Sequence, residues 1–253
     1  MELGFGCTST RRLDSGGSVE FHRCDHATYG QVCAVIAPPL TWPPWADPAL
    51  FARLPAEATV VRTFETQLTD ARDVVLLEWV EGESLMDRVR RTGPLTRGEA
   101  LAVMGEVWRA LSRLKRGIPL EGDKLLPCAH GHVHPRWVQL GPRQVKLGGW
   151  LLGTLKPETE MRVADALLAA APERLRADDA DLHAADVYGL GALLHFALTA
   201  RGPSGTEPSS MSTRSVDPSL SPELRNFVLE LTEPVPQRRP SLEHVGEALA
   251  RLR

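Results

Sequence analysis

The sequence predicts an α+β protein with a small β-rich N-terminal lobe and a larger, mainly α-helical C-terminal lobe. In the N-terminal third, short runs of β-branched and aromatic residues alternate with turn residues, as in β-strands. From Ser84 onward, apolar residues instead recur three and four positions apart, which is the spacing of amphipathic helices. The 253 residues are enough to bury a full hydrophobic core, and we find no internal repeat.

Four strands are expected in the N-terminal lobe, namely Val19–Cys24, Gln31–Ile36, Thr59–Phe64 and Val74–Val80. Between the two pairs lies "PPLTWPPWADP" (Pro38–Pro48), whose prolines exclude a continuous helix or an interior strand. A shortened helix is expected at Asp47–Leu54. The stretch "HRCDH" holds His22, Cys24 and His26, which resemble metal ligands, but a solvated hairpin is the better interpretation.

The helices of the C-terminal lobe carry start signals. Thr96 and Glu99 form a T-x-x-E capping box ahead of a long amphipathic helix. Ala184–Ala200 is apolar on nearly every face, as expected of a helix at the centre of a lobe. Three shorter helices are expected at Ser84–Arg91, after the cap Ser221, and at Ser241–Leu252. The polar, low-complexity segment 202–219 is expected to be a mobile loop.

Composition excludes several classes of protein. Hydrophobic residues make up 43% and charged residues 24% of the chain, which is ordinary for a soluble globular protein. The net charge of -3 provides no basic field for nucleic acid or for an anionic membrane. No apolar run approaches the ~20 residues of a membrane helix, and the N-terminus lacks the core of a signal peptide, so we expect a cytoplasmic location. The 4 cysteines lack C-x-x-C spacing and are interpreted as reduced thiols. Richness in Arg, Ala, Leu and Pro favours a bacterial origin.

Eight short motifs follow one another in a familiar order: "LDSGGSVEF", "VCAV", "VLLEWVEGESL", "HGHVHPRWVQL", "QVKLGGW", "APE", "DVYGLG" and "RRP". In this order and spacing the chain resembles the eukaryotic-type Ser/Thr protein kinases found in bacteria, from about Arg11 to its C-terminus. The resemblance implies one bilobal protein-kinase-like domain over residues 1–253. Its N-lobe would cover about 1–81, its hinge about 80–84 and its C-lobe about 85–253.

Four positions that the resemblance assigns to catalysis hold unsuitable residues. Val35 stands where the family has the phosphate-binding lysine, and the nearest lysine in the sequence is Lys115, in the C-lobe. His132 replaces the catalytic aspartate, Trp137 the metal-binding asparagine, and Gly149 the aspartate of the D-F-G motif. Kinase catalysis consists mostly of positioning and electrostatic stabilisation by these groups. We therefore expect no catalytic residue, no metal, no cofactor, and weak or no ATP binding.

The glycine-rich loop and the activation segment also depart from the pattern of an active kinase. The glycine-rich loop keeps Gly16, but Asp14 would repel phosphates and Val19 would crowd them. In the activation segment, between Trp150 and Ala171, the only hydroxyls are Thr154 and Thr159.

At the positions to which the resemblance assigns a structural role, the chain holds suitable residues. The resemblance gives His130 a role in supporting the catalytic-loop backbone, and Trp150 the packing role of the D-F-G phenylalanine. It pairs Glu173 with Arg239, and it makes Asp186 an anchor for the catalytic loop. Loss of catalytic positions with retention of structural ones is typical of a pseudokinase.

The three histidines have two further interpretations. With Cys128, the alternating His130, His132 and His134 resemble zinc ligands, but the kinase fold needs His130 to point inward. His132 resembles a general base, but it lacks metal ligands and a phosphate-binding lysine beside it. A structural remnant is the preferred interpretation of both.

Trp42 and Trp45 in the proline-rich stretch have two interpretations. They either pack over the gap left by a shortened helix, whose Glu57 has no lysine to orient, or form a protein-docking surface.

The sequence therefore predicts a catalytically inactive signalling pseudokinase that acts as a scaffold or allosteric subunit. Its expected partner is a bacterial protein, such as an active kinase or a complex subunit. Two alternatives stay open: a nucleotide sensor that binds a purine at the hinge near Glu78–Val80, and a divergent transferase that uses His132.

Overall fold

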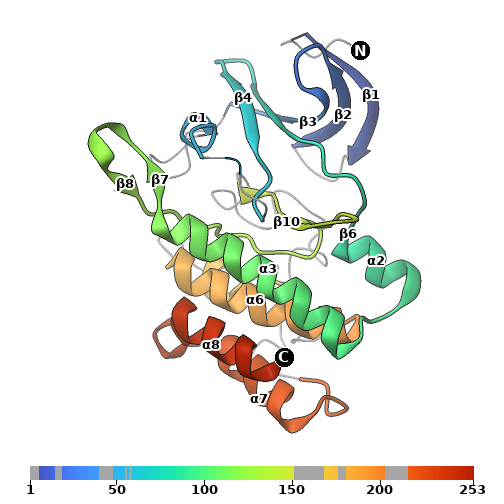
Figure 1. The fold of residues 1–253 in the computed structure, drawn as a ribbon, viewed down its shortest axis with the longest axis vertical. Coiled ribbons are helices and arrows are strands. Elements are labelled where there is room, and N and C mark those ends of the chain that lie inside the picture. The colour runs from blue at the N-terminus through green and yellow to red at the C-terminus, as the bar shows by residue number, and fades with distance from the viewer. Residues whose placement is uncertain are drawn as a thin grey trace.

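The computed structural model describes residues 6–14, 19–39, 48–54, 56, 59–150, 168–175, 181–202 and 216–253. A β-sheet forms the N-terminal part, and helices form most of the C-terminal part below it (Figure 1). The α+β fold class expected from the sequence is confirmed. None of the helices in the described part of the chain has the length and apolar character needed to cross a membrane.

The N-terminal sheet has five antiparallel strands in the order β1-β2-β3-β5-β4. They are β1 (Cys7–Asp14), β2 (Glu20–His26), β3 (Gly30–Ala37), β4 (Thr63–Leu68) and β5 (Asp73–Glu78). Because side chains alternate between the faces of a strand, β3 divides its residues between two clusters. Val32 and Ala34 pack with Cys7, Cys24 and Leu76 on one face, whereas Val35 faces the C-terminal part.

Three expectations for this sheet need correction. The predicted strand Thr59–Phe64 begins four residues later, because Val60 and Val61 turn away to meet the C-terminal part, where the Val61 N–H donates to Leu147 O. His22 and Cys24 are buried rather than solvated, since both lie on the face of β2 from which Cys24 packs with Cys7, Val32 and Leu76. Strand β1 was not expected, because its exposed residues are mostly polar.

The helix after the proline-rich stretch is a single turn, α1 (Pro48–Phe51). It is shorter than the expected Asp47–Leu54, because residues after Phe51 form a tight turn in which the Leu54 N–H donates to Phe51 O. Phe51 and Leu54 are buried against the sheet, so the turn still closes the N-terminal core.

The hinge leads through β6 (Glu83–Ser84) into α2 (Leu85–Thr92) and then α3 (Arg97–Arg116). The Ser84 hydroxyl caps α2 by accepting from the Asp87 N–H. The capping box predicted for α3 is present, because the Glu99 N–H donates to the Thr96 hydroxyl and the Glu99 carboxylate accepts from the Thr96 N–H. Caps of this kind contribute about 1 kcal/mol each.

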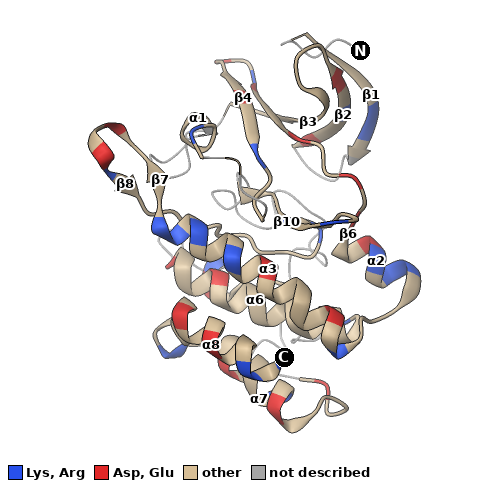
Figure 2. Ribbon diagram, viewed as in Figure 1, with Lys and Arg blue, Asp and Glu red and all other residues tan. Residues whose placement is uncertain are grey.

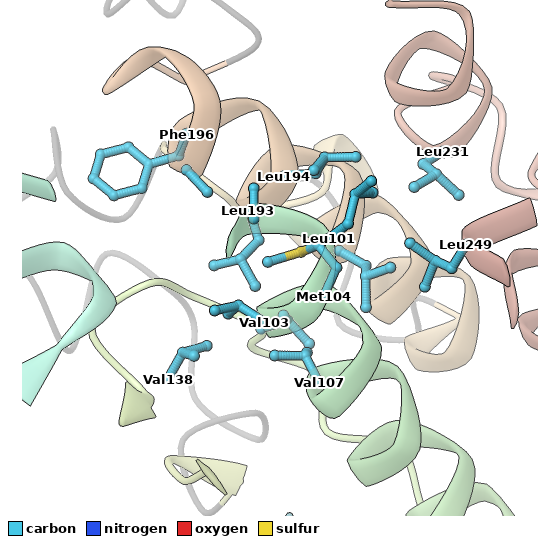
Figure 3. Close-up of a cluster of buried hydrophobic side chains, with 14 of the residues drawn as sticks. Leu101, Val103, Met104, Val107, Val138, Leu193, Leu194, Phe196, Leu231 and Leu249 are labelled. Atoms are coloured by element: carbon cyan, nitrogen blue, oxygen red, sulfur yellow. The ribbon is translucent and has the colours of Figure 1, made fainter. Parts of the chain in front are cut away.

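The C-terminal core surrounds α6 (Leu182–Thr199), which lies between α3 on one side and α7 (Pro222–Leu231) on the other, while α8 (Leu242–Leu252) packs on α3. As expected of a central helix, α6 is buried on nearly every face. Figure 3 shows how Leu101 and Met104 of α3 meet Leu193 and Leu194 of α6, with Leu249 of α8 beside them. This core fixes the helices that carry the site.

Two short hairpins complete the described part. Strands β9 (Val138–Leu140) and β10 (Val145–Leu147) pair beside β6, directly under the N-terminal sheet. Strands β7 (Ile118–Pro119) and β8 (Leu125–Leu126) form a hairpin that projects from the end of α3 and was not expected (Figure 1). Most of the loop predicted at 202–219 lies outside the described residues.

Charges of both signs are distributed over the two parts. Figure 2 shows basic residues on β1, α2 and α3, and acidic residues at the tip of the β7–β8 hairpin and on α7 and α8. This mixture fits the small net charge of -3.

Candidate functional site

A cavity of about 480 Å³ lies between the two parts. Strands β1 to β3 form its roof, the hinge and Glu78 form one side, and the segment from Arg136 to Gly149 forms its floor. This is the place where the resemblance puts a nucleotide. Of the four degraded positions, Trp137 and Gly149 line the cavity, whereas Val35 and His132 do not.

Val35 belongs to an apolar cluster and carries no charge toward the cavity. It is 4% exposed and lies on β3 between Phe21 of β2 and Val75 of β5. Its cluster includes Phe51 and Trp150. A lysine at this position would have to bury its ammonium among these side chains, which is costly without a paired charge.

Trp137 and Gly149, the two degraded metal-binding positions, lie in contact. A Cβ atom on Gly149 would overlap the indole ring of Trp137, and Gly149 has a φ of 75°, which favours glycine. The Gly148 N–H also donates to Trp137 O at 2.9 Å. The indole thus fills the space that an aspartate side chain at position 149 would need, so these residues do not fit a magnesium ion.

The indole of Trp137 also contacts the N-terminal sheet. The ring centroids of Trp137 and Phe21 are 5.1 Å apart, with the planes tilted by 38°. Aromatic pairs at this distance are stabilising by about 0.5–1.5 kcal/mol beyond their buried area. Phe21 was not singled out from the sequence, since nothing local in β2 shows that it meets residue 137.

His132 lies under the end of the activation segment. It is 6% exposed and borders a cavity of only about 10 Å³, together with Ala169–Ala171 and Arg174. Burial, with the neighbouring His134, His130 and Arg174, lowers its pKa well below the ordinary value. A buried imidazole with so low a pKa is poorly suited to act as a general base near neutral pH.

His130 supports the loop backbone. Its Nδ1 accepts from the His132 N–H at 3.2 Å, so Nε2 carries the proton and donates to Gly148 O at 2.7 Å. Burial lowers its pKa to about 4, so the ring is neutral at physiological pH. Both ring nitrogens therefore serve backbone groups.

The histidines of this segment are not brought together with other ligating side chains of the described residues. His132 and His134 lie side by side, with ring centroids 5.8 Å apart, but His134 Nδ1 accepts from the Arg136 N–H. Across the described ranges, no three His, Cys, Asp or Glu side chains are placed to hold a metal ion.

Trp150 stacks on Phe51 of α1, with ring centroids 3.4 Å apart and planes within 4° of parallel. Both rings are at most 2% exposed. The stack joins the segment after β10 to the single helical turn of the N-terminal part. Phe51 falls inside the helix expected from sequence, but no local pattern pairs it with Trp150.

Asp186 of α6 holds the histidine segment in place. Its two carboxylate oxygens accept from the N–H groups of His130 at 2.8 Å and Gly131 at 2.7 Å. Burial raises its pKa to about 7, although these two donors act in the opposite direction. The geometry is that of a backbone anchor.

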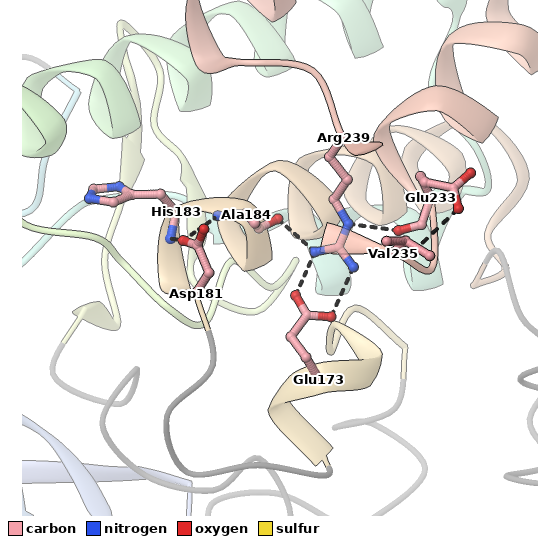
Figure 4. Close-up of polar contacts among 7 residues, drawn as sticks. All are labelled: Glu173, Asp181, His183, Ala184, Glu233, Val235 and Arg239. Carbon is pink, nitrogen blue, oxygen red and sulfur yellow. Dashed lines mark hydrogen bonds and ion pairs between the residues drawn. The ribbon is translucent and has the colours of Figure 1, made fainter. Parts of the chain in front are cut away.

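Glu173 and Arg239 are brought together at the base of the C-terminal part. Figure 4 shows the bidentate pair, in which Arg239 Nη2 donates to Glu173 Oε2 at 2.8 Å. Arg239 also donates to the carbonyls of Ala184 and Glu233 at 2.8 and 2.7 Å. One guanidinium thus joins the 3-10 turn at Pro172–Leu175, the start of α6 and the segment before Arg239.

An ion pair next to the hinge, with a buried lysine, was not predicted from the sequence. Lys146 of β10 donates to both carboxylate oxygens of Glu78, at 2.8 and 2.7 Å, and is 5% exposed. Lysine is rare in this chain, which is the one signal that could have drawn attention to it.

Trp42, Trp45, Glu57 and Gly16 lie outside the described residues. The structure therefore does not test the two interpretations of the tryptophans.

Comparison with solved structures shows that the chain has a protein-kinase-like fold. It aligns with the crystal structure of Rad53 1-466 in complex with AMP-PNP at a TM-score of 0.75 and 17% identity, over 96% of this chain and 64% of that one. No protein-family profile matches the chain.

Two curated proteins are similar in sequence, and both are named as kinases. A probable serine/threonine-protein kinase zyg-1 of Caenorhabditis elegans is 29% identical over 161 residues, which is 63% of this chain and 22% of that protein. A putative sperm motility kinase W of Mus musculus is 23% identical over 197 residues, which is 74% of this chain and 38% of that protein. The chain thus spans well under half of either relative, and the expected bacterial origin stays a prediction.

Proposed function

We propose that this chain is a pseudokinase, a protein-kinase-fold domain that transfers no phosphoryl group and acts by binding another protein. The observation that carries the proposal is the contact of Trp137 with Gly149, because it fills the metal position with an indole. Val35 and the buried His132 support it, since neither can take the role that the family gives to its position. Loss of even one preorganised electrostatic group typically costs about 10²–10³ in rate.

The alternative of a divergent transferase that uses His132 has little support. The imidazole is buried beneath Ala169–Ala171, so a substrate cannot reach it. Its lowered pKa also makes it a weak base.

The protein-binding part of the proposal is supported by what the fold keeps. The Glu173–Arg239 pair and the Asp186 anchor fix segments of the C-terminal part, and the Phe51–Trp150 stack joins that part to the N-terminal part. A scaffold or allosteric subunit needs such a fixed surface, and does not need the catalytic groups. We expect a cytoplasmic signalling partner, such as an active kinase or a complex subunit.

Phosphoryl transfer is tested with ATP labelled at the γ-phosphate, magnesium or manganese, and general protein acceptors. We expect no label above background on the acceptors or on the chain itself, while an active kinase run in parallel labels them. Transfer that disappears in His132→Ala would contradict the proposal.

The partner is sought by affinity purification from the native host followed by mass spectrometry. The double variant Trp42→Ala, Trp45→Ala is the comparison, with thermal unfolding to check its fold. Loss of a specific partner from a folded variant would support the docking interpretation of these tryptophans. Unfolding of the variant would favour their packing role.

A further inference from the structure

Strands β1 and β2 bring a serine, a histidine and a glutamate into one hydrogen-bonded row on the N-terminal sheet. Ser9 Oγ lies 2.9 Å from His22 Nδ1, and His22 Nε2 lies 3.0 Å from Glu20 Oε2. A nucleophile beside a base that a third group orients is the arrangement of serine-dependent acyl transfer. We propose that these three residues form a catalytic site that hydrolyses small carboxylic esters through an acyl group on Ser9.

The row follows from the pairing of the two strands. Glu20 and His22 are two residues apart on β2, so their side chains leave the strand on the same face. Ser9 of β1 stands opposite Cys24, the next residue of that face, and therefore reaches His22 on the diagonal. The register shifts between Ser9 and Arg11, as at a β-bulge. Bulges at sheet edges often re-aim a side chain next to an active site.

This row is separate from the cavity between the two parts. Phe21 and Arg23, the residues of β2 on either side of His22, line that cavity. Because side chains alternate along a strand, His22 and Glu20 lie on the opposite face of the sheet. The inference therefore does not depend on what the cavity binds, and an inert Ser9 would leave the proposed function untouched.

The hydrogen bonds fix which nitrogen of His22 carries the proton. The hydrogen bond from His22, with the nearby charge of Arg12, lowers the pKa of Glu20, so this carboxylate is ionised at neutral pH. An ionised carboxylate only accepts, so His22 Nε2 donates to Glu20 and Nδ1 is left as the acceptor. The Ser9 hydroxyl thus donates to His22 Nδ1, which is the direction in which a base removes the serine proton.

A substrate can approach the serine on the edge of the sheet. Ser9 is partly exposed, whereas His22 is only 3% exposed. Strand β1 is the edge strand, and the outer side of an edge strand presents main-chain N–H groups. Such groups are the usual donors to the oxyanion of acyl transfer. Because Ser9 is only partly exposed, a small acyl group fits better than a bulky one.

The reaction needs only an ester and water. Ser9 Oγ adds to the ester carbonyl while its proton passes to His22 Nδ1, and the alcohol leaves with that proton when the C–O bond breaks. Water then adds to the acyl group, releases the carboxylic acid and restores the Ser9 hydroxyl. In chymotrypsin-type triads Nε2 is the base, whereas here Nδ1 takes that role. Glu20 is a positioning residue, since it orients the imidazole and stabilises its charged form.

The reactivity of Ser9 is measured with a fluorophosphonate, whose phosphorus is attacked by an activated serine with loss of fluoride. Peptide mass spectrometry of the full chain should place the adduct on Ser9. Ser9→Ala should remove this adduct, whereas Thr8→Ala, which changes an exposed neighbouring hydroxyl, should keep it. Absence of an adduct on Ser9 would overturn the proposal.

Hydrolysis of p-nitrophenyl acetate tests the two other residues. His22→Gln should lower kcat by about 10²-fold or more, the usual contribution of a general base. His244→Gln is the matched control, because His244 pairs with Glu230 on the surface of the C-terminal part at 3.5 Å, and it should leave kcat unchanged. Glu20→Gln should lower kcat with KM unchanged. Equal hydrolysis by wild type and Ser9→Ala would overturn the proposal.

Urea midpoints establish that each variant folds, because His22 is buried. Ser9→Cys gives a second measurement that needs no donor to an oxyanion, since a neighbouring imidazole favours the reactive thiolate. Iodoacetamide should alkylate position 9 of Ser9→Cys about tenfold or more faster than in the double variant Ser9→Cys, His22→Gln. Equal rates in the folded variants would overturn the proposal, and if His22→Gln unfolds, the comparison of wild type with Ser9→Ala decides it.

Discussion

Trp137 lies so close to Gly149 that any side chain at position 149 would overlap its indole ring. The two positions that the kinase resemblance assigns to metal binding have therefore become one packing contact, with a large residue on one side and the smallest possible residue on the other.

Gly149→Asp should destabilise the fold by about 2–5 kcal/mol, because it combines overpacking with an aspartate at positive φ. Gly30→Asp is the matched control, since Gly30 has a φ of 69° and open space around it. Its cost should be confined to backbone strain, about 1–2 kcal/mol. Urea unfolding measures both.

Trp137→Asn in the Gly149→Asp background should recover part of this loss. The recovery is measured as a coupling energy from wild type, the two single variants and the double variant. Equal destabilisation by Gly149→Asp with and without Trp137 would contradict the contact.

Glu173→Gln should destabilise the chain by about 3–5 kcal/mol, because it leaves Arg239, whose side chain is 1% exposed, without its carboxylate. The exposed pair Lys115–Glu243 provides the control, and Glu243→Gln should cost less than about 1 kcal/mol. Thermal or urea unfolding distinguishes the two. Similar losses in both variants would show that the buried pair contributes no more than a surface pair.

The stack of Phe51 on Trp150 should couple the two parts of the molecule. In a cycle of Phe51→Leu, Trp150→Leu and the double variant, we expect a coupling energy of about 0.5–1.5 kcal/mol, the usual value for aromatic pairs. Additive losses in urea unfolding would mean that the two rings contribute independently.

His195 of α6 joins two chain segments and should make stability depend on pH. Its Nε2 accepts from the Asp217 N–H at 3.1 Å, so Nδ1 carries the proton and donates to Arg201 O at 2.8 Å. Burial lowers its pKa, although Asp217 and the Arg201 carbonyl act against this. An imidazole with a lowered pKa stabilises the fold fully above its unfolded pKa of about 6.5, and this contribution is lost as the pH falls toward its folded pKa.

His195→Gln keeps a donor and an acceptor but does not titrate, so it isolates this contribution. Between pH 7 and pH 5, wild type should lose stability relative to His195→Gln, as measured by urea midpoints. Contributions from His130 cancel, because both proteins contain it. Parallel pH profiles would show that His195 is not held neutral by the fold.

Sequence reasoning located most elements because their signals are local. The capping box at Thr96 and the all-round apolar character of α6 each arise from residues within a few turns. The strand predicted at Thr59–Phe64 begins later, at Thr63, because Val60 and Val61 are apolar for another reason, namely their contact with Leu147. His22 and Cys24 were misjudged because a strand alone does not reveal which of its faces is covered.

The sequence by itself determined which groups are present: no lysine before Lys115, a histidine and a tryptophan in the catalytic loop, and a glycine in place of the metal-binding aspartate. Only the tertiary structure decided what these residues do. It placed the indole of Trp137 on Gly149, buried His132 under Ala169–Ala171, and paired Lys146 with Glu78. The physical reason is that composition and periodicity fix local conformation, whereas filling a volume or pairing a charge depends on segments that meet only when the chain has folded.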